Sequence, residues 1–110
     1  MPLFITYASY SQSGVQGLLQ KPEDRTAVIQ KLLDGVGAKV VALYMTTGSN
    51  DIVLVTEAQD GEDAVAVGMA VASTGSLSKI ETVRAWTGAD FAGIAQKAGS
   101  LTGAYSPPGS

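Results

Sequence analysis

The sequence predicts an α+β domain of the ferredoxin-like class, in which an antiparallel sheet carries its helices on one face. The first observation is the order of the patterns: strand, helix, strand, tight turn, strand, helix and strand, all before residue 88. This βαββαβ order is that of the split βαβ motif. The second observation is composition. The chain has 110 residues, 45% of them hydrophobic and 15% charged, which indicates one globular domain.

The first strand and the connection after it differ sharply in composition. Leu3 to Tyr10 is rich in β-branched and aromatic residues, as strands are. Residues 11–21 are expected to form a connection with one helical turn over Val15 to Gln20. Pro22 and the two acidic residues after it then predict a helix start, because proline suits a first turn and carboxylates favour the positive end of the helix dipole.

The helix that follows carries one apolar stripe. Val28, Leu32 and Val36 recur at a spacing of four residues, which places them on one helix face. Gly35 and Gly37 are expected to end this helix, because glycine enters the left-handed cap conformation at little cost.

The middle of the chain predicts a β-hairpin. Two apolar runs, residues 39–47 and 51–58, flank the turn at residues 48–50, whose Gly and Asn tolerate positive φ. Residues 52–55 are apolar at every position, which indicates a central strand covered on both faces. Asp51 suits either a turn residue that accepts backbone N–H groups or a functional acid, and turn chemistry favours the first.

The last third of the chain predicts a second helix from Asp60 to Gly75 and a fourth strand over residues 78–87. Thr87 then matches the start of a capping box, which predicts a short third helix. Residues 1–98 are therefore expected to form one domain. Residues 99–110 are rich in Gly, Ser, Thr and Pro, so an ordered tail must lean on its own domain or on another molecule.

The strands carry more apolar surface than one layer of helices can cover. A two-layer domain leaves one sheet face open, and large exposed apolar patches mark interfaces. The sequence therefore predicts a homo-oligomer, a dimer or a multiple of dimers paired sheet to sheet. The residues behind this expectation are Phe4, Tyr7, Tyr10, Tyr44, Met45, Val53, Val55 and Trp86.

Composition also excludes several classes of function. The chain has no His and no Cys, which removes the Ser/His/Asp triad, thiolate metal sites and disulfides. The net charge of −3 argues against nucleic acid as a partner. No apolar run approaches the length of a membrane span and no signal peptide is visible, so a cytoplasmic location is expected. No metal and no cofactor are predicted.

Five side chains are candidates for a ligand-binding cavity. Tyr7, Tyr44 and Trp86 could line it, while Glu57 could act as an acid and Arg84 as an anion clamp. The aromatic residues equally suit core or interface packing. Glu57 and Arg84 equally suit a cross-strand or intersubunit salt bridge. The sequence leaves both interpretations open and identifies no catalytic residue.

Short motifs make the chain similar to GYD domain proteins, a small bacterial family, from Phe4 to about Ala98. The residues that carry this resemblance are Ile5 to Tyr10, Ala38 to Val40, Gly48 to Asp51, Val55 to Ala58 and Glu81 to Thr87. Gly48 and Asp51 fit the Gly-Tyr-Asp signature of the family, but Asn50 stands where the tyrosine is expected. The resemblance implies a dimeric α/β-barrel-like assembly and no particular reaction.

Two hypotheses for function follow. The leading one is a noncatalytic, oligomeric module that binds a small molecule or serves assembly, with the ligand between helices and sheet or at the dimer seam. The alternative is a cofactor-independent enzyme, oxygenase- or isomerase-like, that acts on a small apolar or aromatic substrate in a barrel cavity. That alternative rests on fold analogy.

Overall fold

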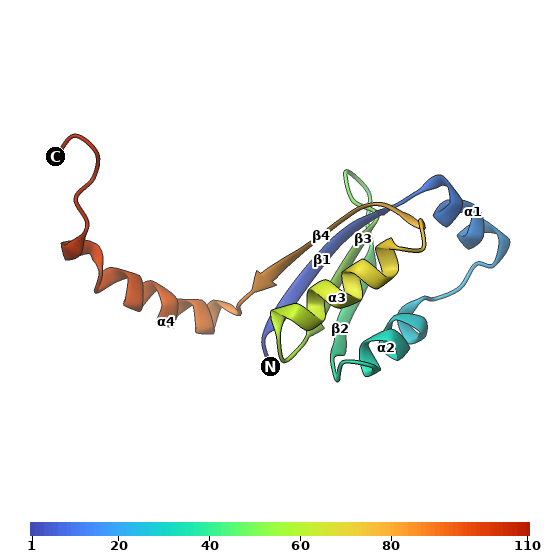
Figure 1. The fold of residues 1–110 in the computed structure, drawn as a ribbon, viewed down its shortest axis with the longest axis horizontal. Coiled ribbons are helices and arrows are strands. Elements are labelled where there is room, and N and C mark those ends of the chain that lie inside the picture. Colours follow the sequence, from blue (N-terminus) through green and yellow to red (C-terminus); the bar gives the residue numbers. More distant parts are fainter.

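The computed structural model describes residues 1–110 as a four-stranded sheet with helices packed on one side and a helical extension at the C-terminal end (Figure 1). The elements occur in the order β1 (Leu3–Tyr10), α1 (Gln12–Gln20), α2 (Thr26–Asp34), β2 (Lys39–Met45), β3 (Ile52–Glu57), α3 (Gly61–Ala72), β4 (Leu77–Ala85), α4 (Gly88–Gly99) and the short 3-10 helix η1 (Thr102–Ala104).

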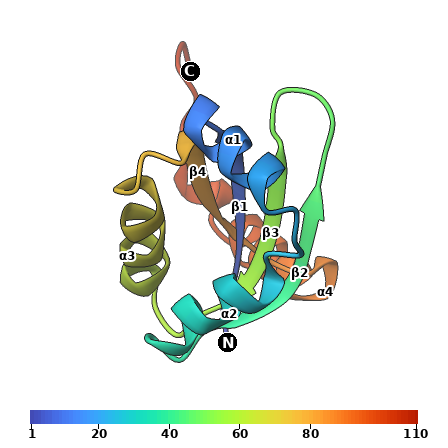
Figure 2. The same ribbon diagram turned by 90° about the vertical axis from the view of Figure 1, so that its right-hand side faces the viewer.

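The sheet confirms the predicted ferredoxin-like fold. Its strand order is β2-β3-β1-β4, and every neighbouring pair is antiparallel. The central strands are β1 and β3, as predicted for β3, but helices cover only one face of β3, so its apolar residues Val53 and Val55 are only partly buried. Helices α1, α2 and α3 lie on the same side of this sheet (Figure 2).

The strand register separates a helix-covered face from an open face. Phe4 packs in the core with Leu33 of α2, so every second residue of β1 from Phe4 onward faces the helices. The residues between them point the other way. Cross-strand partners share a face, so two rows of side chains cross the middle of the open face, and the charged residues Lys39, Glu57 and Lys79 lie toward its ends. The rows are Tyr44, Val53, Tyr7 and Glu81, and Ala42, Val55, Ile5 and Val83.

The core beneath the helices is small. Only seven of the 110 residues are buried, and four of them form one cluster. That cluster joins Phe4 of β1 to Leu33 of α2, with Ala38 and Ala58 beside them. The helices therefore hold the sheet mainly at one end.

The segment before α2 differs from the prediction in two ways. Residues 12–20 form a complete helix, because the Ser11 side chain accepts a hydrogen bond from the Gly14 N–H and caps the first turn. Helix α2 begins only at Thr26. The Asp24 carboxylate accepts hydrogen bonds from the Thr26 N–H at 2.9 Å and from its hydroxyl at 2.6 Å, so Asp24 precedes the helix.

The other turns and caps match the sequence chemistry. Asp60 caps α3 by accepting from the Glu62 N–H, and Thr87 caps α4 by accepting from the Asp90 N–H at 3.1 Å. Gly37, Gly48 and Gly75 have positive φ at the turns predicted for glycine. Each of these confirmed predictions depends on residues that lie within a few positions of one another in the chain.

Asp51 has the structural role that turn chemistry favoured. Its carboxylate accepts the Tyr10 N–H at 2.9 Å, and its own N–H donates to the Ala8 carbonyl. The hairpin is thereby fixed to the end of β1. Asn50, beside it, keeps a buried Oδ1 with no hydrogen-bond partner.

The C-terminal part of the chain leaves the body of the domain. We call residues 86–110 the arm. Figure 1 shows α4 projecting from the end of β4 rather than packing on the sheet. The longest dimension of the molecule is 60 Å, and the radius of gyration is 17.7 Å. A compact chain of this length has about 13 Å, so the arm determines the elongated shape.

Two glycines in α1 test how this helix sits on the sheet. A Cβ at Gly14 would overlap the Ser76 carbonyl oxygen, whereas a Cβ at Gly17 would have nothing within 4 Å. We expect Gly14→Ala to lower the free energy of unfolding by about 1–3 kcal/mol through overpacking. Gly17→Ala should raise it by up to about 1 kcal/mol, because alanine is the better helix former. Urea unfolding of both variants measures this, and equal effects would contradict the close approach.

Candidate functional site

A cleft of about 680 Å³ lies between the three body helices and the helix-covered face of the sheet. Most of its lining is apolar. The residues that form this lining include Leu18 of α1, Val28, Ile29 and Leu32 of α2, Val67 and Val71 of α3, and Leu54 and Ile80 of the sheet. Because the small core cluster holds only one end of the layers, the rest of the interlayer space stays available to a ligand.

The floor of the cleft carries a few hydroxyl groups. Thr6 lines the cleft, and its hydroxyl lies 2.8 Å from the hydroxyl of Thr82 on the neighbouring strand. Thr56 also lines it and is buried. An apolar cleft with few polar groups is the usual form of a small-molecule site, since the polar groups orient what the apolar wall holds.

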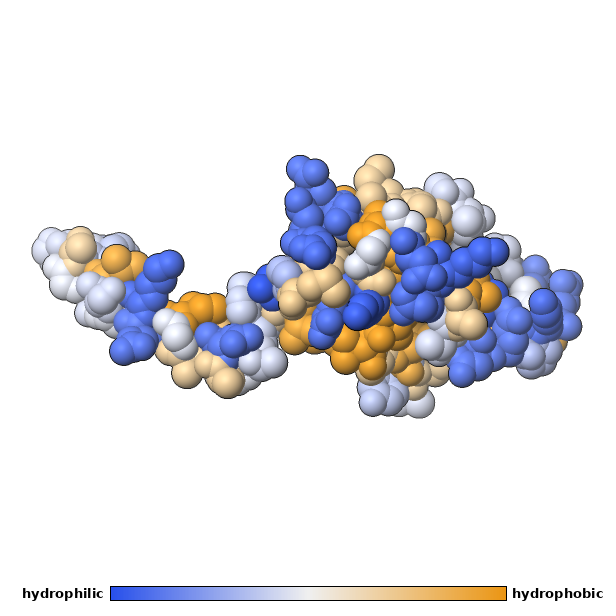
Figure 3. All heavy atoms as spheres, turned by 90° about the horizontal axis from the view of Figure 1, so that it is seen from below, coloured by the Kyte–Doolittle hydropathy of each residue, from blue (hydrophilic) through white to orange (hydrophobic).

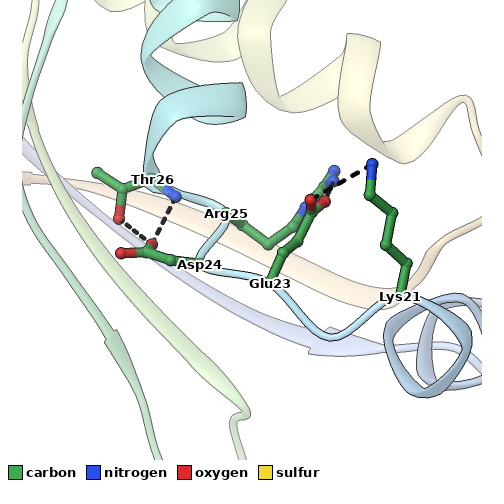
Figure 4. Close-up of polar contacts among 5 residues, drawn as sticks. All are labelled: Lys21, Glu23, Asp24, Arg25 and Thr26. Atoms are coloured by element: carbon green, nitrogen blue, oxygen red, sulfur yellow. Dashed lines mark hydrogen bonds and ion pairs between the residues drawn. The ribbon is translucent and has the colours of Figure 1, made fainter.

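A small ionic cluster forms part of the rim between α1 and α2 (Figure 4). Glu23 accepts a hydrogen bond from Arg25 at 2.6 Å, and its other oxygen lies 3.7 Å from the Lys21 ammonium. The Arg25 hydrogen bond lowers the pKa of Glu23 below its ordinary value, helped by both positive charges and opposed by desolvation. The Glu23 carboxylate therefore stays ionised in neutral solution.

Asp24 points away from this cluster and serves the backbone instead (Figure 4). Hydrogen bonds from the Thr26 side chain and backbone lower the pKa of Asp24. Both carboxylates are thus stabilised in the charged form, which suits anchoring of the α1–α2 connection rather than proton transfer near neutral pH.

The five candidate residues from the sequence lie outside this cleft and on different faces. Tyr7 and Tyr44 flank Val53 in one row of the open face, and Glu57 pairs with Leu3 on the same face. Arg84 pairs with Phe4 and so lies on the helix-covered face. The sheet therefore brings the two tyrosines close together and separates Glu57 from Arg84.

Arg84 and Trp86 form a contact of their own at the end of β4. The Arg84 guanidinium lies 4.5 Å from the Trp86 ring centroid and 5.7 Å from that of Phe4. It also donates hydrogen bonds to the Leu3 and Ala85 carbonyl oxygens. Arg84 thus ties the start of β1 to the point where the arm begins.

No residue of the cleft was predicted from the sequence as a ligand contact. The sequence shows these residues only as packing patterns: the apolar stripe of α2 includes Val28 and Leu32. Ala64, Gly68 and Ala72 recur every four residues and form a face of small residues on α3, and the first two line the cleft. A Cβ at Gly68 would meet Ile80 Cδ1 at 3.6 Å, an ordinary contact. Periodicity identifies such residues as facing the sheet, but it does not show whether the two layers close on each other.

The carboxylates do not gather into a metal site: no group of three or more His, Cys, Asp or Glu side chains could hold an ion. The acidic residues Asp60, Glu62 and Asp63 lie at the start of α3, where Asp60 caps the helix and the other two occupy its first turn. None of the helices combines the length and apolar character that a membrane crossing requires.

These features define a ferredoxin-like α+β protein with an apolar cleft under its helices and an uncovered sheet face. The chain belongs to the GYD domain family, whose family model matches residues 4–95. It is 36% identical over 91 residues to a Thermus thermophilus protein named glutamine synthetase and cystathionine beta-lyase binding protein. That match covers 83% of this chain and 95% of the relative.

Solved structures share the fold at lower sequence identity. TTHA0845 of Thermus thermophilus superposes with a TM-score of 0.50 at 17% identity, over 79% of this chain and 95% of that one. FFRP-DM1 gives 0.51 at 13% identity, over 78% of this chain and all of that one. MtbAldR gives 0.53 at 14% identity, over 78% of this chain and 52% of that one. At such identities these similarities establish the fold alone.

The rim cluster predicts a measurable titration. Because the pKa of Glu23 is lowered from its ordinary 4.5, its stabilising contribution is complete above pH 4.5 and is lost as pH falls through the folded-state pKa. We expect Arg25→Gln to raise the Glu23 midpoint toward 4.5, since the Arg25 hydrogen bond is the largest cause. Lys21→Gln should raise it less. Carboxyl carbon NMR titrations measure both, and an unmoved midpoint in Arg25→Gln contradicts the assignment.

Proposed function

We propose that the protein is a noncatalytic binding module that holds a small apolar molecule in the cleft between its helices and its sheet, and that it works as a homo-oligomer. The observation that carries this proposal is the cleft itself. Its volume of about 680 Å³ falls within the roughly 300–1,000 Å³ typical of small-molecule sites.

The lining defines the ligand class. Aliphatic side chains from α2, α3 and the sheet offer dispersion contacts and no strong hydrogen-bond donors, which favours an apolar ligand body. The threonine hydroxyls on the floor can orient one polar group of the ligand. The rim charges of Lys21, Glu23 and Arg25 are already paired with one another, so the ligand needs no charge of its own.

The alternative, a cofactor-independent enzyme, finds less support in the geometry. It requires Glu57 and Arg84 to face one substrate, whereas their cross-strand partners, Leu3 and Phe4, alternate between the two faces of the sheet. Neither side chain borders the cleft. An acid and an anion clamp on opposite faces cannot act on the same atom of a substrate.

Leucine placed at Gly68 tests the cleft directly. Gly68→Leu should extend a side chain into the space between α3 and the sheet, and it should abolish retention of any co-purified small molecule in native mass spectrometry. Binding of N-phenylnaphthylamine, a neutral apolar dye, should fall by about tenfold or more.

A control lies at the next residue of the same helix. Met69 is 68% exposed and does not line the cleft, so Met69→Leu should leave retention and dye binding unchanged. Equal dye binding by Gly68→Leu and the parent protein would contradict a ligand site in the cleft.

A second candidate function is binding to other proteins. It is favoured by the name of the Thermus relative, which describes a protein that binds two enzymes, glutamine synthetase and cystathionine beta-lyase. The uncovered sheet face and the arm offer the surfaces for such contacts. Binding of this chain to the two purified enzymes from its own source, measured by biolayer interferometry, tests the candidate, and no binding to either at micromolar concentration contradicts it.

A further inference from the structure

We propose that the free edge of strand β2 is a docking site for an extended segment of another protein. That segment would add a strand to the sheet, place an apolar side chain in a groove beside α2 and bring a basic side chain to Asp24. This inference rests on the second candidate function, binding to other proteins, and it is independent of what the cleft holds.

The two edges of the sheet differ in how they are protected. Strands β2 and β4 form these edges (Figure 2). Charged side chains on an edge strand oppose its pairing with another chain. Strand β4 carries Lys79, Glu81 and Arg84 along its length, whereas β2 carries only Lys39, its first residue. The β2 edge is therefore the one that is open to pairing.

Strand β2 also exposes apolar side chains. Figure 3 shows apolar residues at the surface of the body as well as along the arm. On β2 the exposed fractions are 52% for Val41, 63% for Tyr44 and 53% for Met45. Such exposure on an unpaired strand is typical of a surface that a partner covers.

The backbone of β2 has hydrogen-bonding groups that face away from the sheet. The Thr46 N–H donates to the Asp51 carbonyl at 2.8 Å, so the backbone of Thr46 is directed toward β3. Because this direction alternates along an antiparallel strand, the N–H and C=O groups of Leu43 and Met45 point to the free edge. An extended chain supplies donors and acceptors at the same two-residue spacing, and it can pair with both residues.

A side-chain amide already occupies the first part of this edge. Gln30 of α2 accepts a hydrogen bond from the Val40 N–H at 2.9 Å and donates one to the Ala38 carbonyl at 3.1 Å. A neighbouring strand would make the same pair of bonds with its backbone. Gln30 covers the edge only up to the irregularity between Val40 and Ala42, so an added strand would pair beyond that point.

A groove of about 500 Å³ lies beside the open part of the edge. One wall is β2 itself, and the other is the start of α2 with the residue that precedes it. The residues that line the groove are Val40, Val41, Ala42 and Leu43 on the strand side and Asp24, Thr26, Ala27 and Gln30 on the helix side. In strand addition the backbone bonds give affinity, and pockets for alternate side chains give specificity. The apolar part of this groove fits an aliphatic side chain.

Asp24 gives the groove a negative charge that no cation of the chain neutralises. Both ion pairs of the protein involve Glu23 instead, and Asp24 points away from that cluster (Figure 4). Its Oδ1 accepts both hydrogen bonds from Thr26, which leaves Oδ2 available to a donor. Complementary charge therefore favours a Lys or Arg in the docked segment.

Selection from a random heptapeptide library displayed on phage, with the full-length protein as bait, tests the site. The enriched peptides should contain Lys or Arg together with β-branched residues, and they should lack proline. A selected peptide, synthesised with a fluorescein label, should shift the amide NMR signals of Leu43 and Met45 and slow their hydrogen exchange. A library that yields no peptide, or peptides that perturb only other amides, would overturn the proposal.

Matched alanine sites test the groove by fluorescence anisotropy with the same peptide. Ala27→Leu fills the groove and should weaken peptide binding by about tenfold. Ala66→Leu makes the same change at an exposed position of α3 that lines neither the groove nor the cleft, and it should leave binding unchanged. Equal affinities of the two variants would show that the groove takes no side chain, contrary to the proposal.

The charge of Asp24 has its own pair of variants. Asp24→Asn retains an oxygen that can accept the Thr26 hydrogen bonds, so the loss of charge should weaken peptide binding by about two- to fivefold. Glu62→Gln removes one negative charge from the exposed start of α3 and should have no effect. An equal effect of both variants would mean that only net charge matters and would overturn the contact with Asp24.

The backbone pairing is tested at Met45. Met45→Pro removes the N–H that faces the free edge, where proline is tolerated in a strand, whereas Met45→Ala keeps it. The proline variant should lose peptide binding and the alanine variant should retain most of it, with circular dichroism confirming that both fold. Peptide binding that survives in Met45→Pro would overturn strand addition.

Two further measurements separate this site from its alternatives. If the parent protein and Ala27→Leu bind the same enzyme equally well, protein binding stands and docking at β2 is overturned. If the parent binds neither enzyme but the peptide still docks at β2, the second candidate function fails and the site remains. Sedimentation equilibrium should show no change in the assembly at saturating peptide. Dissociation by the peptide would show that a second copy occupies the edge and would overturn docking of another protein.

Discussion

The constraint on which this structure depends is that a four-stranded sheet has two faces and one layer of helices covers only one of them. The strands place apolar side chains on both faces, with Phe4, Leu54 and Ile80 toward the helices and Ile5, Val55 and Val83 away from them. Burial of apolar area is the main favourable term in folding, and only seven residues are buried in the single chain. Both the cleft and the proposed assembly follow from this imbalance.

The polar contacts fix how the layers meet. Gln30 of α2 accepts the Val40 N–H at 2.9 Å and donates to the Ala38 carbonyl, so it holds α2 against the start of β2. Asp51 fixes the hairpin to β1 at the other end. Gly14 allows α1 to lie against Ser76. These contacts hold the ends of the layers and leave the aliphatic middle open, which is where the proposed ligand would bind.

Under these proposals the two faces of the sheet have different functions. The helix-covered side holds the cleft, with its ionic rim at Lys21, Glu23 and Arg25, and the open side offers a surface for a second copy. A ligand in the cleft would add contacts between helices and sheet, and such binding stabilises the folded state by mass action.

The sequence by itself determined the βαββαβ order, the hairpin, the caps at Asp60 and Thr87 and the family, because each depends on residues close together in the chain. It missed most of α1 and placed the start of α2 too early, because the competing hydrogen bonds of Ser11 and Asp24 are not visible in composition. Only the tertiary structure decided which face each strand residue occupies. Register sets that parity across strands far apart in sequence, so Glu57 and Arg84 are separated, the cleft opens between the layers, and α4 extends from the body.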